Sequence, residues 1–470
     1  MATFSSGYSA ALGNILSQVN DAFSGKTAGI DVSSVVDSLM QVEDQPMTQM
    51  QSEQTTINSQ ISALTTINTE LTALQTSVQA LEDPINGALS QMTAGTSDSS
   101  LVAAAADNTA TAGTHTVTVS QLATTSSSYS DYISSGSSLA GAEIQVEYGN
   151  PNDPSSTDTI NIPTSDTTLQ DAASYINSGG YGVTASVVTD SVGSRLVLNS
   201  NTSGAAGNLT VTSSATDFTT TAGVDAELTV DGVPVDSSTN TVTGAIPGVT
   251  LSLGAADPNT PVLISVEPDT NGAATAIQNF VTAYNDVMNS INDQYTLDSS
   301  GNEGVLAGDS MVETLQSQLL NMISTSVSGV GQYTNLQSMG IEMQDNGTLD
   351  VDSTVLSNAL SSDYSDVLNF FTSTSPQGWG EIANTEMTQL TDPTQGPVAL
   401  DINGLNQTND DLSSEISDFQ ANMANVQQAL TTQYDNLDTL LMQYPLEIQE
   451  AQDQLSSLPG ATSTTNNNTL

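Results

Sequence analysis

The 470-residue sequence has almost no positive charge. It contains 52 Asp and Glu residues against two Lys and Arg residues, Lys26 and Arg195, which gives a formal net charge of −50. Binding to a phosphate backbone or to an anionic membrane surface depends on Lys and Arg contacts that release counterions. We therefore expect neither nucleic acid nor membranes as partners.

The residue types that carry most metal and enzyme chemistry are also scarce. There is no cysteine, so the chain forms no disulfide, no thiolate metal site and no thiol nucleophile. His115 is the only histidine, which argues against a zinc site built from several histidines and against a Ser-His-Asp triad. We predict that His115 lies on the polar side of a strand as an exposed or hydrogen-bonded residue. The sequence predicts a protein that is not an enzyme and needs no cofactor.

Carboxylates are the remaining candidates for chemistry. Neighbouring pairs such as Asp410 and Asp411 are expected by chance among 52 acidic residues, and a glycosidase pair needs a defined spacing in space. The loop at residues 298–303 lacks the alternating acidic pattern and the distal Glu of an EF-hand. We interpret this loop as a surface turn and predict no metal site.

Aromatic residues make up 4% and charged residues 11% of the chain, both low values for a globular protein. The length allows two to four domains. No apolar run approaches the length of a membrane span. The start, MATFSSGYSAALGN, lacks the basic segment and long apolar core of a secretory signal, so export would need another route.

Two stretches near the ends of the chain carry apolar residues at intervals of mostly three or four. The first set is Ile57, Ile61, Leu64, Ile67, Leu71, Leu74, Val78 and Leu81, and the second is Leu412, Ile416, Phe419, Met423, Val426, Leu430, Leu437, Leu440 and Tyr444. This spacing places each set on one face of a helix, as in a coiled coil. Neither helix buries its apolar face alone, so each needs a partner.

Two interpretations of these faces stay open. In one, the helices close an ordinary domain as a hairpin or bundle; in the other, they form a stalk that docks on other copies or on another protein. For the second interpretation we expect contacts with other chains through twelve residues: Ile57, Ile61, Leu64, Leu71, Leu74, Val78, Leu412, Ile416, Phe419, Met423, Val426 and Leu430.

The region between the two stretches changes from helical to β-type patterns and back. Alternating β-branched residues predict strands at 101–106, 114–119, 143–148, 157–162, 182–188, 195–199, 208–212, 226–230, 232–235, 248–253 and 262–266, with a short helix at 168–176. Asp231-Gly232 predicts a tight hairpin turn. After Pro268 a helical period returns, with helices near 276–291, 311–323 and 353–371, a hairpin or turn at 340–349, and a connection around Trp379. Pro46 should interrupt or restart a helix, and Pro445 should bend or end one. Asp31 or Ser33 should cap the helix that begins there, and the helix at 311–323 should be capped near Asp309.

These patterns predict an α+β multidomain fold, with a helical coiled-coil or bundle base from both termini and two β-rich modules inserted between them. The expected division is a disordered segment (1–30), an N-terminal leg and bundle helix (31–94), a first β-module (95–124 with 223–267), a second, inserted β-module (125–222), a C-terminal bundle part (268–400), a C-terminal coiled-coil leg (401–458) and a disordered tail (459–470). Both termini should lie at one end and the β-modules at the other.

Several sequence segments are more specific as an ordered set than singly. They are GIDVSSVVDSLM at 29–40 followed by Glu43 and Pro46, GTHTVTVSQLA at 113–123, INS, GVTA and RLVL at 176–178, 182–185 and 195–198, FVTAYND at 280–286, LAGDS at 306–310 and GIEMQDNGTL at 340–349. Over nearly the whole chain, this set resembles the family of flagellar filament-capping proteins, also called flagellar hook-associated protein 2.

The resemblance implies a structural cap at the distal end of the bacterial flagellar filament, outside the cell, that retains exported flagellin and promotes its ordered polymerisation. It also implies a homo-oligomeric ring, expected to be a pentamer, whose terminal helices contact flagellin at the filament tip. A flagellar export chaperone and export through the flagellar type III apparatus are implied as well. The alternatives are another axial flagellar component, such as a junction protein, and an extracellular adhesin that uses the β-modules.

The sequence departs from that family in its charge, because the usual scattering of Lys and Arg is almost absent. Its polarity comes mainly from Ser, Thr, Asn and Gln, whereas a salt-adapted surface would carry many charges. We therefore expect an acidic rather than a saline external medium.

Overall fold

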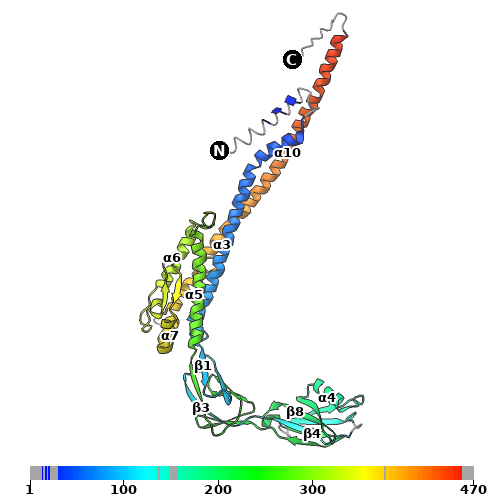
Figure 1. Ribbon diagram of the computed structural model, residues 1–470, viewed down its shortest axis with the longest axis vertical. Coiled ribbons are helices and arrows are strands. Elements are labelled where there is room, and N and C mark those ends of the chain that lie inside the picture. Colours follow the sequence, from blue (N-terminus) through cyan, green and yellow to red (C-terminus); the bar gives the residue numbers. More distant parts are fainter. Residues whose placement is uncertain are drawn as a thin grey trace.

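The computed structural model describes residues 30–134, 138–148, 157–374 and 377–457, together with residues 13, 16, 17, 20 and 21. The molecule is a long helical stalk with a helical bundle against its lower half, and a β-rich arm projects sideways from the bundle's far end (Figure 1). The segments predicted to be disordered, 1–30 and 459–470, lie almost entirely outside the described residues. The predicted α+β fold, with β-sheets inserted between helices from both ends of the chain, is confirmed.

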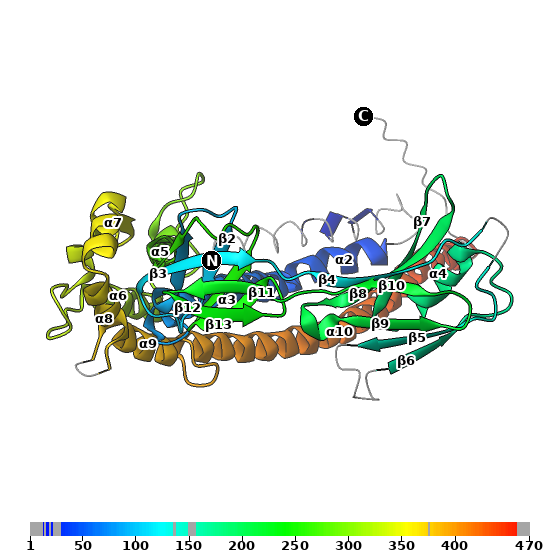
Figure 2. The same ribbon diagram turned by 90° about the horizontal axis from the view of Figure 1, so that it is seen from below.

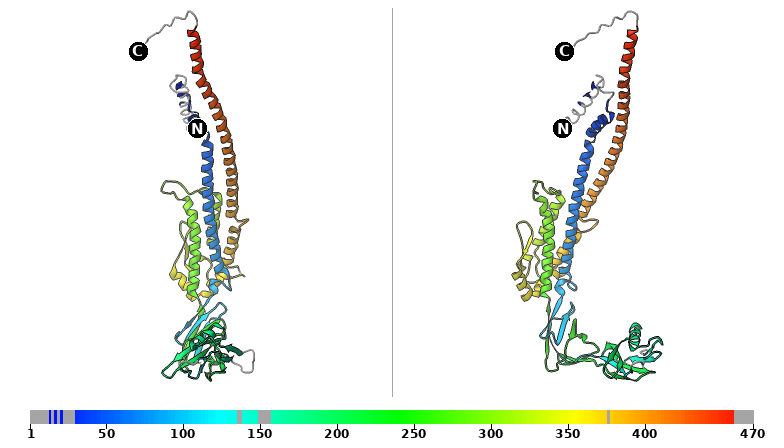
Figure 3. Two further views of the ribbon diagram at one scale, coloured as in Figure 1. Left: turned by 90° about the vertical axis from the view of Figure 1, so that its right-hand side faces the viewer. Right: turned by 45° about the vertical axis from the view of Figure 1, so that its right-hand side comes forward.

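The stalk consists of α2 (Val32–Glu43), α3 (Gln45–Glu82) and α10 (Pro397–Ser456). As predicted, Asp31 caps α2 through its side chain, and Pro46 lies in the first turn of α3, where its missing N–H costs nothing. Helix α10 packs along both α3 and α2, and the views in Figure 3 show the helices side by side. Of the two outcomes predicted for Pro445, an end of the helix does not occur, since α10 continues through it to Ser456.

The helical base is the bundle formed by α5 (Thr270–Tyr295), α6 (Ser310–Ser324), α7 (Ser353–Ser362), α8 (Tyr364–Thr372) and α9 (Trp379–Leu390) with the lower parts of α3 and α10. A short helix η1 (Ala88–Ser90) and the hairpin β16 (Ile341–Met343) and β17 (Leu349–Val351), preceded by η4 (Leu336–Met339), complete it. The helix predicted at 353–371 is two helices that meet at Asp363.

Trp379 lies in the core of the helical base rather than in a connection, which corrects the prediction. Its side chain is fully buried, and its ring packs edge-on to Phe280 and Phe371 and stacks on Phe370. The indole Nε1 donates a hydrogen bond of 3.1 Å to the carbonyl oxygen of Met322. The Gly/Pro/Thr-rich composition around it gave no helical period, although α9 begins at this residue.

The first part of the arm is an antiparallel sandwich of two sheets. One sheet has the order β1 (Met92–Thr96), β15 (Val262–Pro268), β3 (Gly113–Gln121), β11 (Ala226–Val230) and β12 (Val233–Ser237), and the other has β13 (Thr241–Ile246), β14 (Val249–Leu253) and β2 (Val102–Ala106). Val, Leu and Ile side chains from both sheets share one core. The chain leaves this sandwich after β3 and re-enters it at β11.

The second part lies at the end of the arm (Figure 2). Its sheets are β10 (Phe218–Thr221), β4 (Thr125–Ser130), β8 (Ser194–Ser203) and β7 (Val183–Thr189), and β6 (Thr157–Asn161), β5 (Glu143–Tyr148) and β9 (Leu209–Ser213). Helix α4 (Leu169–Ser178), predicted from the sequence, begins at a capping box made by Thr168 and Asp171 and packs on β7. A short helix η3 (Ala205–Gly207) joins β8 to β9.

Four of the described strands were not predicted from the sequence: β1, β4, β10 and β13. Strand β4 has the sequence TSSSYS, and its inward side chains are the buried Ser126, Ser128 and Ser130. Their hydroxyls are all hydrogen-bonded, for example Ser126 Oγ, which donates to the Thr221 carbonyl oxygen and accepts from the Leu209 N–H. Because the side chains on its core face are serines, β4 shows no alternation of apolar and polar residues. Its sequence is therefore typical of a linker.

Candidate functional site

The predicted contact residues divide into groups along the stalk. The lowest group has no exposed surface and belongs to the core of the helical base; it consists of Leu64, Leu71, Leu74 and Val78. They pack in the same core as Ile277, Phe280 and Tyr284 of α5, and as Ala383 and Met387 of α9. This part of the N-terminal apolar face is thus covered within the chain, as the bundle interpretation expects.

The middle and upper groups join the two ends of the chain. Ile57 and Ile61 of α3 pack with Leu412 and Ile416 of α10, and Gln54 donates a hydrogen bond of 2.7 Å to the Ser413 hydroxyl nearby. Higher up, Met423, Phe419, Val426 and Leu430 of α10 pack with Val36 and Met40 of α2. An open groove beside this contact has a volume of about 800 Å³ and is lined by Asp, Ser, Gln and Met side chains of α2, α10 and the first turn of α3.

Among the described residues, Ile30 makes the uppermost contact between the N-terminal part of the chain and α10. Its side chain packs on Leu441, and its backbone N–H donates a hydrogen bond of 2.7 Å to Oδ1 of Asp438. Near and beyond this point α10 exposes a series of large apolar side chains, with exposed fractions between 37% and 67%: Leu437, Leu440, Met442, Tyr444, Leu446, Ile448 and Leu455. The spacing of apolar residues predicts the helical apolar face as far as Leu437, Leu440 and Tyr444. The same face continues to Ile448 and Leu455, which the prediction did not include.

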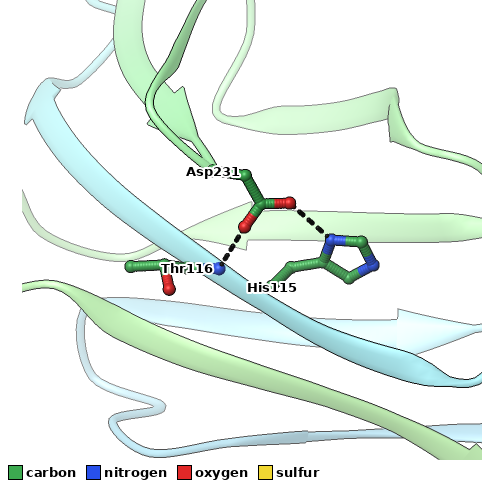
Figure 4. Close-up of polar contacts among 3 residues, drawn as sticks. All are labelled: His115, Thr116 and Asp231. Carbon is green, nitrogen blue, oxygen red and sulfur yellow. Dashed lines mark hydrogen bonds and ion pairs between the residues drawn. The ribbon is translucent and has the colours of Figure 1, made fainter.

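In the arm, the polar contacts of His115 are structural. His115 lies on β3, and its Nδ1 is 2.8 Å from Oδ2 of Asp231, whose other oxygen accepts a 2.8 Å hydrogen bond from the Thr116 N–H (Figure 4). Asp231 and Gly232 both have positive φ and form the predicted tight turn between β11 and β12. The prediction of a hydrogen-bonded strand histidine is confirmed.

Arg195 of β8 is held between two aromatic rings. Its guanidinium lies 3.6 Å from the centroid of Tyr132 and 5.1 Å from that of Tyr129, and Nη1 donates to the Ser130 carbonyl oxygen at 3.2 Å. The Tyr132 hydroxyl donates to Asp190 Oδ2 at 2.6 Å. These contacts pin the start of β8 to the end of β4.

The acidic residues of the described part of the chain do not gather into a metal site. No group of three His, Asp or Glu side chains within it is placed to hold a metal ion. In the loop at residues 298–303, Asp298 Oδ1 accepts hydrogen bonds from the N–H groups of Ser300 and Asn302, as in an ordinary turn. Of the helices described, none has the length and apolar character needed to cross a membrane.

A long two-stranded stalk with an uncovered apolar tip, a helical base and a β-rich arm define the class of protein: a structural component of a larger assembly. Comparison with known proteins gives the family. The models of the flagellar hook-associated protein 2 N-terminus and C-terminus match residues 28–126 and 223–445, which together make up more than half of the chain, and the flagellin hook IN motif matches residues 152–202. The chain belongs to the flagellar hook-associated protein 2 family, whose members are structural and not enzymes.

The similarity to individual members extends over most of the molecule. The B-type flagellar hook-associated protein 2 of Pseudomonas aeruginosa is 27% identical over 420 residues, covering 82% of this chain and 86% of that protein. The Escherichia coli K12 protein is 27% identical over 374 residues, 73% of this chain and 78% of that one. The crystal structure of the flagellar cap protein FliD D1-D2-D3 domains from Escherichia coli aligns with a TM-score of 0.59 and 25% identity over 73% of this chain and 99% of that one.

Proposed function

We propose that this protein caps the distal end of a bacterial flagellar filament, outside the cell, retaining exported flagellin and promoting its ordered addition. The chain is a homologue of a flagellar cap protein along nearly the full length of that protein's crystallised domains. Its membership of the family implies interaction with the filament.

The observation that supports contact through the stalk is the uncovered apolar face of α10. Leu440, Tyr444 and Ile448 are each more than half exposed, although they continue the spacing by which α10 packs on α2 and α3 lower down. An exposed apolar row of this length on a soluble protein marks a binding surface. Flagellin at the filament tip is the proposed partner of this apolar row. The row is called the tip region and consists of Leu437, Leu440, Tyr444, Ile448 and Leu455.

The cap itself is proposed to be a ring of copies of this chain, with a pentamer as the expected number. In such a ring the stalks point toward the filament and the arms lie away from it. The shape supports this arrangement, because stalk and arm leave the helical base in different directions (Figure 1). A flagellar export chaperone that shields the tip region before export is part of the same proposal.

The proposal is tested by a variant with Leu440→Gln, Tyr444→Gln and Ile448→Gln, introduced as the sole copy in the source bacterium. The variant protein should fold and be secreted. The cells should nevertheless release flagellin monomers into the medium and carry few or no filaments. A matched variant with Gln443→Ala, Glu447→Ala and Gln454→Ala changes exposed polar residues of the same segment and should swim normally. Normal filaments in the first variant would contradict a contact through the tip region.

A further inference from the structure

Three interfaces of the helical base place one carboxyl group against another. Glu70 of α3 is hydrogen-bonded to Ser290 of α5, one helical turn from Asp286. Glu82 at the end of α3 is hydrogen-bonded to Asn384 of α9, one helical turn from Glu381. The third pair is Asp401 of α10 and Asp309, the residue that caps α6; burial, and then the charge of Asp309, raise the pKa of Asp401. Tyr295 lies near Asp309 as well, and among the described residues no Lys or Arg belongs to the helices that form the three pairs.

Each pair contains an oxygen atom that has no hydrogen-bond donor. Glu70 accepts a 2.9 Å bond from the Ser290 hydroxyl through Oε1, while its Oε2 is buried without a partner. In the second pair, Glu82 Oε2 accepts from Asn384 Nδ2 at 2.6 Å, and Oε2 of Glu381 is buried and unpaired. In the third, Oδ2 of Asp401 is buried and unpaired. A buried acceptor without a donor is costly, and a charged one more so.

Arg195, the only Lys or Arg among the described residues, lies in the arm and not at these sites. Arg195 is held by Tyr129 and Tyr132 in the arm, and neither Lys nor Arg occurs in the sequences of α3, α5, α6, α9 or α10. Burial, and then the neighbouring carboxylate, raises the pKa of Glu70 and Glu82 above the usual 4.5 and that of Asp401 above the usual 3.8. Hydrogen bonds to Ser290 and Asn384 offset only part of this effect.

We propose that these carboxyl pairs make the helical base a proton-stabilised structure, more stable in mildly acidic than in neutral surroundings. One carboxyl of each pair takes up a proton from the solvent, which removes one of the two like charges. For Asp401 and Asp309, the new O–H donates to the partner's oxygen, so a repulsive contact becomes a hydrogen bond. This inference goes beyond the capping function and does not depend on it.

Proton linkage determines in which direction the stability of the helical base changes with pH. A carboxyl with a higher pKa in the folded state binds more protons folded than unfolded, so stability rises as the pH falls through the raised pKa. In the arm, carboxyl groups with a lowered pKa make the stability fall, not rise, at low pH. Asp98 and Asp107 accept hydrogen bonds from the hydroxyls and N–H groups of Ser100 and Thr109, which lower the pKa of both carboxyls. Their contribution is lost as the pH falls below 3.8, so mild acid should strengthen the base without strengthening the arm.

Trp379 makes this testable in the full-length protein. It is the only tryptophan and is buried in the helical base, so its fluorescence follows the unfolding of the base alone. We expect the melting temperature reported by Trp379 to rise by about 3 °C or more between pH 7.5 and pH 4.5 at constant ionic strength. In a variant with Glu70→Gln, Glu82→Gln and Asp401→Asn, the melting temperature should already be raised at pH 7.5 and should change little on acidification.

A control variant separates paired carboxyls from the overall charge. Glu53→Gln, Asp418→Asn and Asp435→Asn remove the same number of charges from exposed positions of α3 and α10, and this variant should keep the pH dependence of the natural sequence. If the melting temperature of the control variant at pH 7.5 rose by the same amount, the effect would be due to net charge, and the proposal would be overturned. A natural protein that melts no higher at pH 4.5, or a paired variant that is less stable at pH 7.5, would overturn it as well.

Discussion

Nδ1 of His115, the only histidine of the chain, lies 2.8 Å from Oδ2 of Asp231, which is the one residue other than glycine with a positive φ in the described part of the chain. The contact joins the middle strand β3 to the tip of the β11–β12 hairpin, and the second oxygen of Asp231 accepts the Thr116 N–H. One carboxylate thus fixes both the turn and its position on the sheet.

Asp231→Asn should change the pH dependence of the arm's stability at low pH, below about 4. The Thr116 N–H, and then His115, lower the pKa of Asp231 below the usual 3.8, so its contribution is present at higher pH and is lost as the pH falls through the lowered value. Asn tolerates the turn conformation and keeps an acceptor but does not titrate. The variant should be slightly less stable than the natural protein at pH 6 and equal to it near pH 2, by thermal unfolding at 218 nm. Asp236→Asn, on the exposed side of β12, serves as the control and should show no such convergence.

Leu71→Asp should destabilise the helical base by about 3 kcal/mol or more, because it removes a fully buried side chain and introduces a charge without a partner. The loss should appear in the Trp379 transition measured with urea. Leu440→Asp makes the same change at a side chain that is 56% exposed and should leave this transition within about 0.5 kcal/mol of the natural value. Equal effects of the two changes would contradict the assignment of Leu71 to the core of the base.

Ser126→Ala should cost about 1–3 kcal/mol in the stability of the outer part of the arm, since it leaves the Leu209 N–H and the Thr221 carbonyl oxygen without their hydroxyl partner. The neighbouring Ser127 points to the other face of β4, and Ser127→Ala should be nearly neutral. Denaturant unfolding followed by tyrosine fluorescence gives the comparison. A neutral Ser126→Ala would mean that the buried serines are not required for packing.

Replacement of residues 125–222 by a short Gly/Ser linker should leave the helical part folded. The chain leaves and re-enters the inner sandwich at one place, where the Thr124 N–H donates to the Val224 carbonyl oxygen and Gln121 pairs with Glu227. Helix content per remaining residue, by circular dichroism, should be at least as high as before. A collapse of the helical signal would show that 125–222 is not a separable unit.

Assembly of the proposed ring should strengthen as the pH falls. Copies with a formal charge of −50 repel one another at neutral pH, and bound protons reduce that repulsion, so association takes up protons. Sedimentation at pH 3.5 and pH 8 in low salt should show the larger species at pH 3.5. A ring equally stable at both values, or stable only at pH 8, would contradict an acidic working medium.

The sequence alone determined the features that depend on local chemistry. The spacing of apolar residues predicts the stalk helices, Asp231-Gly232 predicts its hairpin, and Asp31, Asp309 and Pro46 mark helix starts, because capping, turn conformation and helical period are properties of neighbouring residues. The ordered set of motifs indicated the family. Strand β4 and helix α9 were missed because buried serines and a Gly/Pro/Thr-rich lead-in carry no periodic hydrophobic signal.

Only the tertiary structure decided which partner each surface meets. The apolar faces of α3 and α10 look alike in sequence, yet Leu64 to Val78 are buried against α5 and α9, Ile57 meets Leu412, and the face around Tyr444 stays uncovered. The register between strands brings His115 to Asp231, and helix packing brings Asp401 to Asp309 from positions far apart in the chain. These pairings depend on which elements lie side by side, and local composition carries no information about that choice.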